Sequence, residues 1–150
     1  MDLTLIIVLL VAHFVGDFIC QSDWMALNKS KRWDALGLHV ACYIAIVSLM
    51  MAVFQPPSQY PYTEIALFVR FLMVNAIAHF VQDAITSRIN SKLWFIELGE
   101  QYDTGRRNGV YFPKYHASVF PNKRHWFFVG IGADQLLHYI TLFVTAYYLL

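Results

Sequence analysis

The feature that most constrains this chain is a long segment without charge. Residues 35–54, ALGLHVACYIAIVSLMMAVF, contain no Asp, Glu, Lys or Arg. A helix needs roughly 20 mostly apolar residues to cross a membrane. A helix on the surface of a water-soluble bundle, by contrast, shows a polar stripe to the solvent. The segment therefore predicts a membrane-spanning helix.

Three further segments have the length and apolar character of spans, at about 3–22, 64–85 and 126–150. The composition agrees, because 58% of the residues are hydrophobic and only 14% are charged, whereas soluble domains average roughly 25% charged residues. The sequence therefore predicts an all-α fold, an integral membrane bundle of four transmembrane helices that forms a single domain over residues 1–150.

The charge and the cysteine count exclude other classes of protein. The formal net charge is +1, so binding of nucleic acid through overall basicity is not expected. The two cysteines lie in apolar segments, which does not fit a disulfide-stabilised secreted module. The expected partners are membrane lipids. A homo-oligomer is a further option, because four spans make a thin bundle.

The basic residues predict the orientation of the spans. The loop between spans one and two and the loop between spans three and four hold all but one of the 11 Lys and Arg residues. Positive residues are retained on the cytoplasmic side of a membrane. We therefore expect both of these loops in the cytoplasm and both termini on the opposite side of the membrane.

The connection between spans three and four, residues 86–125, is expected to be a long cytoplasmic loop. Its first part, TSRINSKLWFIELGEQ, mixes apolar and charged residues, as helices lying in the membrane interface do. The remainder contains several Gly and Pro residues, which favour irregular structure. The sequence predicts an interfacial helix followed by an aromatic-rich lid at the level of the lipid headgroups.

Ionisable residues inside the predicted spans are costly in hydrocarbon and therefore indicate function. Three spans carry a His and an Asp four residues apart, a spacing that places both side chains on one helix face. In the predicted topology these groups lie at comparable depths, so we expect one cluster of four His and three Asp. Its members are His13, Asp17, His39, His79, Asp83, Asp134 and His138.

Imidazole and carboxylate are the ligands of zinc, manganese and iron in proteins. A catalytic zinc takes three protein ligands and a water, so seven donors exceed one site. We expect one or two divalent transition-metal ions, with zinc as the leading choice, and a bridging Asp where there are two. The expected catalytic carboxylates are Asp17, Asp83 and Asp134. A proton or ion path and a purely structural network remain open alternatives for the same cluster.

Further polar residues are expected to support the cluster or to hold a substrate. Amide and carboxylate side chains near the expected ligands would orient them, and basic side chains would bind an anionic headgroup. The expected supporting residues are Gln21, Asp23, Asn75, Gln82 and Gln135, and the expected anion-binding residues are Lys29, Arg106 and Arg107.

Several motifs together resemble a known family. They are His13-Phe14-x-x-Asp17-Phe18, Gln21-Ser22-Asp23-Trp24-Met25-Ala26, Asn28-Lys29, His39, His79-x-x-x-Asp83 and Asp134-Gln135-x-x-His138. They are similar to the small bacterial and phage membrane proteins of domain-of-unknown-function family 3307. The resemblance covers all four spans but not the segment 86–125. It implies a bacterial inner membrane, with both termini in the periplasm. It supports the positions of the candidate residues and implies no activity.

Three functions are compatible with these patterns. The leading hypothesis is a membrane-embedded, metal-dependent hydrolase that acts on a lipid-linked or phosphate-containing substrate from the cytoplasmic leaflet. The second is a proton or divalent-metal transporter that uses the same His and Asp residues. The third is a non-catalytic membrane scaffold or phage–host interaction protein whose working part is the segment 86–125.

Overall fold

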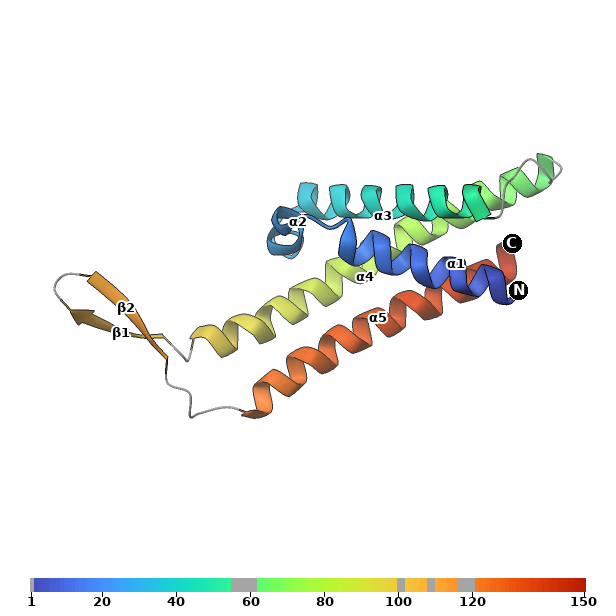
Figure 1. The fold of residues 1–150 in the computed structure, drawn as a ribbon. Helices are drawn as coiled ribbons and strands as arrows, with labels where there is room; N and C mark the ends of the chain where they lie inside the picture. The colour runs from blue at the N-terminus through green and yellow to red at the C-terminus, as the bar shows by residue number, and fades with distance from the viewer. Residues whose placement is uncertain (1, 55–61, 100–101, 108–109, 116–120) are drawn as a thin grey trace.

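A computed structural model describes the backbone of residues 2–54, 62–99, 102–107, 110–115 and 121–150, and the side chains of 2–54, 65–92 and 125–150. The long helices pack against one another as a bundle, and a hairpin lies at one end of it (Figure 1). In chain order, the elements are α1 (Leu3–Phe14), the π-helical segment η1 (Val15–Ile19), α2 (Asp23–Asn28), α3 (Trp33–Phe54), α4 (Tyr62–Gly99), β1 (Tyr102–Arg107), β2 (Val110–Tyr115) and α5 (Pro121–Leu149).

Among the described residues, three helices are long and apolar enough to cross a membrane, which indicates an integral membrane protein. They are α3, the part of α4 over Ile65–Lys92, and the part of α5 over His125–Leu149. The N-terminal helix, Leu3–Ile19, is apolar but shorter. At 1.5 Å per residue it is about 25 Å long, against roughly 30 Å of hydrocarbon. The helix expected as the first span, at 3–22, is therefore shorter than predicted and ends at Ile19.

The outer surface of the bundle is apolar, and ionisable side chains are buried, unlike in a soluble protein. Large apolar residues face outward on every long helix, for example Ile77 at 61% exposed and Leu136 at 60%. The buried residues include all seven of the His and Asp residues predicted to cluster. An outer surface of this kind suits lipid, because contiguous apolar surface is unfavourable in water.

An apolar core lies beside the polar cluster, toward the end of the bundle where both termini lie (Figure 1). On each long helix the core residues are displaced from the cluster in the same direction. In α1 they precede His13, in α3 they follow His39, and in α5 they follow His138. The core consists of Val8, Leu9, Ala12, Tyr43, Val47, Met51, Phe71, Leu142 and Ala146.

The segment 86–125 is more regular than predicted. Helix α4 runs unbroken for 38 residues to Gly99, so residues 86–99 continue the third span and do not form a separate interfacial helix. The charged residues that follow the predicted limit at residue 85 are accommodated along this helix. The guanidinium of Arg88, for instance, lies 4.2 Å from the centre of the Trp33 ring.

An antiparallel hairpin follows in place of the expected irregular loop. Strands β1 and β2 pair in a register that sets Tyr102 opposite Tyr115 and Arg107 opposite Val110. The intervening sequence Asn108-Gly109 is a strong signal for a two-residue hairpin turn, and it was not used in the prediction. The all-α prediction holds for the helical bundle, to which the hairpin is an addition.

Candidate metal centre

Asp17 reaches the centre from a π-helical turn. The α1 helix changes to η1 at Val15, and the N–H of Cys20 donates to the carbonyl of Val15 at 2.8 Å. Such turns are rare and occur frequently at functional sites. Gly16 lets η1 approach α3 closely, because a Cβ at Gly16 would lie 3.1 Å from Cδ2 of Tyr43 and 3.3 Å from its Cα.

This close approach leads to a first prediction, that Gly16→Ala destabilises the protein. Tyr43 cannot yield easily, because it is buried and its ring stacks on His79 with the centroids 3.9 Å apart. Overpacking of this kind costs about 1–3 kcal/mol. Thermal unfolding in detergent should show a lower melting temperature for Gly16→Ala. The matched control is Gly37→Ala, where nothing lies within 4 Å. Equal melting temperatures for the two variants would contradict the assigned packing.

Four buried donors from η1, α3 and α4 converge on one point. Nε2 of His39 lies 3.0 Å from Oδ1 of Asp17 and 3.0 Å from Oδ2 of Asp83. It also lies 3.2 Å from Nε2 of His79, which is itself 3.5 Å and 3.8 Å from the same two oxygens. A tetrahedral zinc with ligand distances of about 2.0–2.1 Å would separate its donors by about 3.3–3.4 Å. The spacing of these donors therefore fits a single metal ion.

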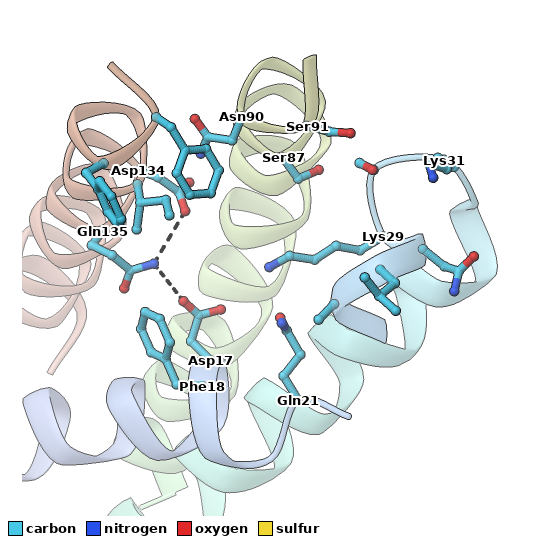
Figure 2. Close-up of a pocket in the computed structure, with 17 residues that line it drawn as sticks. Asp17, Phe18, Gln21, Lys29, Lys31, Ser87, Asn90, Ser91, Asp134 and Gln135 are labelled. Atoms are coloured by element: carbon cyan, nitrogen blue, oxygen red, sulfur yellow. Dashed lines mark hydrogen bonds between the residues drawn. The ribbon is translucent and has the colours of Figure 1, made fainter. Parts of the chain in front are cut away.

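His13 differs from the other three histidines of the cluster in its hydrogen bonding, because both of its ring nitrogens have a partner. Nδ1 pairs with the hydroxyl of Tyr43 at 3.3 Å and Nε2 with Oε1 of Gln135 at 3.0 Å. Nε2 of Gln135 donates to Oδ2 of Asp17 at 2.8 Å and to Oδ2 of Asp134 at 3.3 Å (Figure 2). Gln135 therefore links His13 to two of the carboxylates.

Asp134 and His138 complete the cluster from α5, one helical turn apart. Nδ1 of His138 lies 3.6 Å from Oδ1 of Asp134, and Nε2 lies 3.7 Å from Oδ1 of Asp83. All seven predicted His and Asp residues are thus brought together. Within the described side chains they can be grouped into sets of three or four whose donor atoms lie within 4.8 Å of one another.

Buried polar atoms without a hydrogen bond are concentrated at this cluster. Buried polar groups in proteins nearly always have a partner, so such a concentration indicates that a further ligand belongs here. In the part of the chain whose side chains are described, these atoms are Oδ1 of Asp17, Oε1 of Gln21, Nδ1 of His39 and of His79, Oδ1 of Asp83 and of Asp134, and both ring nitrogens of His138.

Lys29 brings a positive charge to the same place. Its ammonium lies 2.9 Å from Oδ2 of Asp83 and 3.4 Å from Nε2 of His39. It follows α2, a short helix that begins where the hydroxyl of Ser22 accepts from the N–H of Met25 at 3.3 Å. With neutral imidazoles, three carboxylates and one ammonium leave two negative charges, which a divalent cation would neutralise. Uncompensated charge is costly in a buried site.

A pocket of about 740 Å³ opens beside the cluster, between η1, α2 and the adjoining parts of α4 and α5 (Figure 2). Carboxylates of the cluster form part of its lining, and the remaining walls differ in character. The cluster side consists of Asp17, Asp134 and Gln135, the polar wall includes Gln21, Asn28, Lys29, Ser30, Lys31, Ser87, Asn90 and Ser91, and the apolar wall includes Phe18, Leu27, Phe127, Phe128 and Ile131.

Five of the eight residues predicted to support the cluster or to bind an anion fall into two groups. Gln21, Lys29 and Gln135 lie at the cluster or its pocket. Asn75 and Gln82 instead connect α4 to α5, since their amides donate to the hydroxyls of Thr145 and Thr141 at 2.8 and 2.7 Å.

The other three predicted residues lie elsewhere. Asp23 is exposed in the first turn of α2. Arg106 and Arg107 lie in β1, and their side chains are outside the described part of the structure.

Sequence reasoning missed Tyr43 and several polar residues of the pocket, among them Lys31, Ser87, Asn90 and Ser91. Tyr43 follows His39 by four residues, a spacing that places both on one face of α3 and could have identified it. Ser87, Asn90 and Ser91 follow Asp83 at one and two helical turns, which extends the polar face of α4 beyond the cluster.

Comparison with known proteins confirms the motif resemblance and extends it to the segment 86–125, which the motifs did not cover. A family model described as "Protein of unknown function (DUF3307)" matches residues 5–150, which is nearly the whole chain. No curated protein and no solved structure matches the chain. The match includes every residue of the candidate metal centre.

Proposed function

The chain belongs to the DUF3307 family, and we propose that it is a membrane-embedded, metal-dependent hydrolase with four spans. The substrate would be lipid-linked or phosphate-containing, presented from the cytoplasmic leaflet of a bacterial inner membrane. The observation that carries this proposal is the donor set of Asp17, His39, His79 and Asp83 beside an open pocket. A zinc-like ion held there would activate a water for attack on an ester.

The residues that line the pocket favour a substrate with an anionic head and an apolar chain. Lys29 and Lys31 line one wall with hydroxyl and amide side chains, and phenylalanines line another. Ammonium groups and neutral donors together bind phosphate, and exposed aromatic side chains bind acyl or prenyl chains through apolar contact. A volume of about 740 Å³ is within the range of small-molecule sites, roughly 300–1,000 Å³.

The apolar core favours hydrolysis over transport. A transporter needs a polar path that reaches both faces of the membrane. On the side of the cluster toward the chain termini, the buried residues Leu9, Val47, Phe71 and Leu142 fill the bundle. This apolar packing supports access to the site from the opposite end only, as a hydrolase acting on one leaflet requires.

The arrangement of the ends also supports the proposed orientation. Both termini lie at one end of the bundle, and α2 and the hairpin lie at the other (Figure 1). The basic residues are concentrated in the connections that contain α2 and the hairpin. By the positive-inside rule, the pocket would open toward the cytoplasm.

The metal content of detergent-purified protein tests the proposal, with His79→Ala as the key variant. We expect at least one zinc-like ion per wild-type chain and less than about one tenth of that in His79→Ala, because one of four ligands is lost. The matched control is His125→Ala, an exposed histidine outside the cluster. Circular dichroism would verify that the variants are folded. A wild-type protein without stoichiometric metal would refute the proposal.

Activity is tested with phosphatidic acid in vesicles, where release of inorganic phosphate is expected from metal-loaded wild-type protein and not from His79→Ala. A flux of protons or divalent ions in proteoliposomes, without any hydrolysis, would instead favour a transporter.

A further inference from the structure

One metal ion does not use all the donors of the centre. After Asp17, His39, His79 and Asp83 are assigned to a first ion, two further sets remain within the described side chains. One contains Asp83, Asp134 and His138, and the other contains His13, Asp17 and His138. Both need His138, so at most one of them describes a second ion.

The hydrogen bonds distinguish the two sets. Both ring nitrogens of His13 have partners, and Oδ2 of Asp17 accepts from Gln135. In the other set, both ring nitrogens of His138 and Oδ1 of both Asp83 and Asp134 lack a hydrogen bond. His138 is 3% exposed and Asp83 is 1% exposed, so water from bulk solvent does not readily serve these atoms. The unused donors therefore belong to the set on α4 and α5.

Asp83 has one oxygen directed to each set. Its Oδ2 lies 3.0 Å from Nε2 of His39, at the first set, whereas its Oδ1 lies 3.7 Å from Nε2 of His138, at the second. A carboxylate with its two oxygens facing two groups of donors has the arrangement of a bridging ligand. Bridged ions in two-metal hydrolases are roughly 3.5–4 Å apart.

We propose that the centre holds two divalent cations, bridged by Asp83, with the second ion bound by Asp134 and His138. The inference rests on the proposed metal centre and adds the number of ions and their ligands. His13 is a positioning residue in this arrangement, because it acts through Gln135 on the carboxylates of Asp17 and Asp134.

The charge of the centre predicts the order of binding and the ligand that accompanies the second ion. The first ion neutralises the two negative charges left by three carboxylates and Lys29. A second divalent ion then brings an excess of two positive charges, which a phosphate dianion in the adjoining pocket would balance. The second ion should therefore bind more weakly than the first, and inorganic phosphate should strengthen its binding by about tenfold or more.

Titration of metal-free wild-type protein with Mn²⁺ tests the inference directly. We expect two ions per chain at saturation, and electron paramagnetic resonance should show the exchange-coupled signal of a close Mn²⁺ pair. Asp134→Asn and His138→Gln should each bind one ion and lose the coupled signal. The control is His125→Gln, an exposed histidine outside the cluster, which should still bind two ions.

Saturation of the wild-type protein at one ion, or two uncoupled ions, would overturn the second site. Hydrolysis by a protein with one ion would leave the proposed function standing, so the two failures are distinguishable. Two ions retained in Asp134→Asn and His138→Gln would show that other residues bind the second ion, and would overturn the assignment. Because the coupled signal is measured on the wild-type protein, a variant that does not fold leaves the test intact.

Discussion

Asp83→Asn is expected to remove metal from the centre and to abolish hydrolysis. Asp83 contacts four groups of the centre through its two oxygens, namely His39, His79, Lys29 and His138. Changes to residues that only orient metal ligands cost about 10–100-fold in affinity. Loss of a ligand that is also the proposed bridge should cost at least about 100-fold. Elemental analysis and phosphate release measure both effects.

The same variant should also lose the stabilisation that metal gives to the fold. A ligand at 100 times its dissociation constant stabilises the native state by about 2.7 kcal/mol. Addition of a chelator should therefore lower the melting temperature of the wild-type protein and leave that of Asp83→Asn unchanged. The matched control is Asp34→Asn, because the Asp34 side chain is 58% exposed, lies outside the centre, and contacts the equally exposed Arg32 and the N–H of Ala35. A chelator response in Asp83→Asn equal to the wild type would contradict this role for Asp83.

The sequence was sufficient to predict which residues form the cluster. Hydrocarbon makes each buried ionisable group costly, so His and Asp four residues apart on separate spans have few locations other than a shared interior. The pentapeptides HFVGD at 13–17 and HFVQD at 79–83 illustrate this. Their aspartates, Asp17 and Asp83, each lie 3.0 Å from the same atom of His39.

The fourth residue of these pentapeptides shows why the rest could not be predicted. Gly16 permits contact between η1 and Tyr43, whereas Gln82 donates to Thr141 and to the carbonyl of Leu137 on α5. Adjacent helix positions differ by about 100° around the axis, so the rotation of each helix decides which amide reaches the cluster. Packing between helices fixes that rotation. The position of Gln82 and Asn75 within one segment therefore predicted that they support the ligands. In the structure their side chains instead connect α4 to α5.

The predicted limits of the helices differ from the observed ones for a related reason. Span limits were predicted from hydropathy, which ends where charged residues begin, but helix α4 continues to Gly99 because nothing in residues 86–98 breaks a helix. Backbone hydrogen bonding continues through polar residues in water or at the membrane interface. Hydropathy thus predicts where a span ends and not where the helix ends. The π-helical turn at Val15–Ile19 depends on packing against α3, and no pattern within α1 predicts it.

Lys29→Met is expected to separate metal binding from catalysis. The Lys29 ammonium lies 2.9 Å from Oδ2 of Asp83 and 3.4 Å from Nε2 of His39, which makes it a neighbour of any ion bound there. Two unit charges 4 Å apart interact by about 4 kcal/mol at an effective dielectric constant of 20, and the charge on a divalent ion doubles this. Removal of the ammonium therefore relieves repulsion, and metal affinity should rise by at least about tenfold.

Hydrolysis by Lys29→Met should fall although the metal is bound more tightly. Removal of one preorganised group that stabilises developing negative charge costs roughly 10²–10³ in rate, and Lys29 lines the pocket where the phosphate of the substrate would lie. The control is Lys92→Met, an exposed lysine on α4 that should leave both quantities unchanged. If Lys29 served only to hold α2 against the bundle, its loss would lower stability and metal affinity together. Opposite changes in affinity and turnover, measured on the same preparation, are therefore specific to a residue that faces both the ion and the anionic substrate.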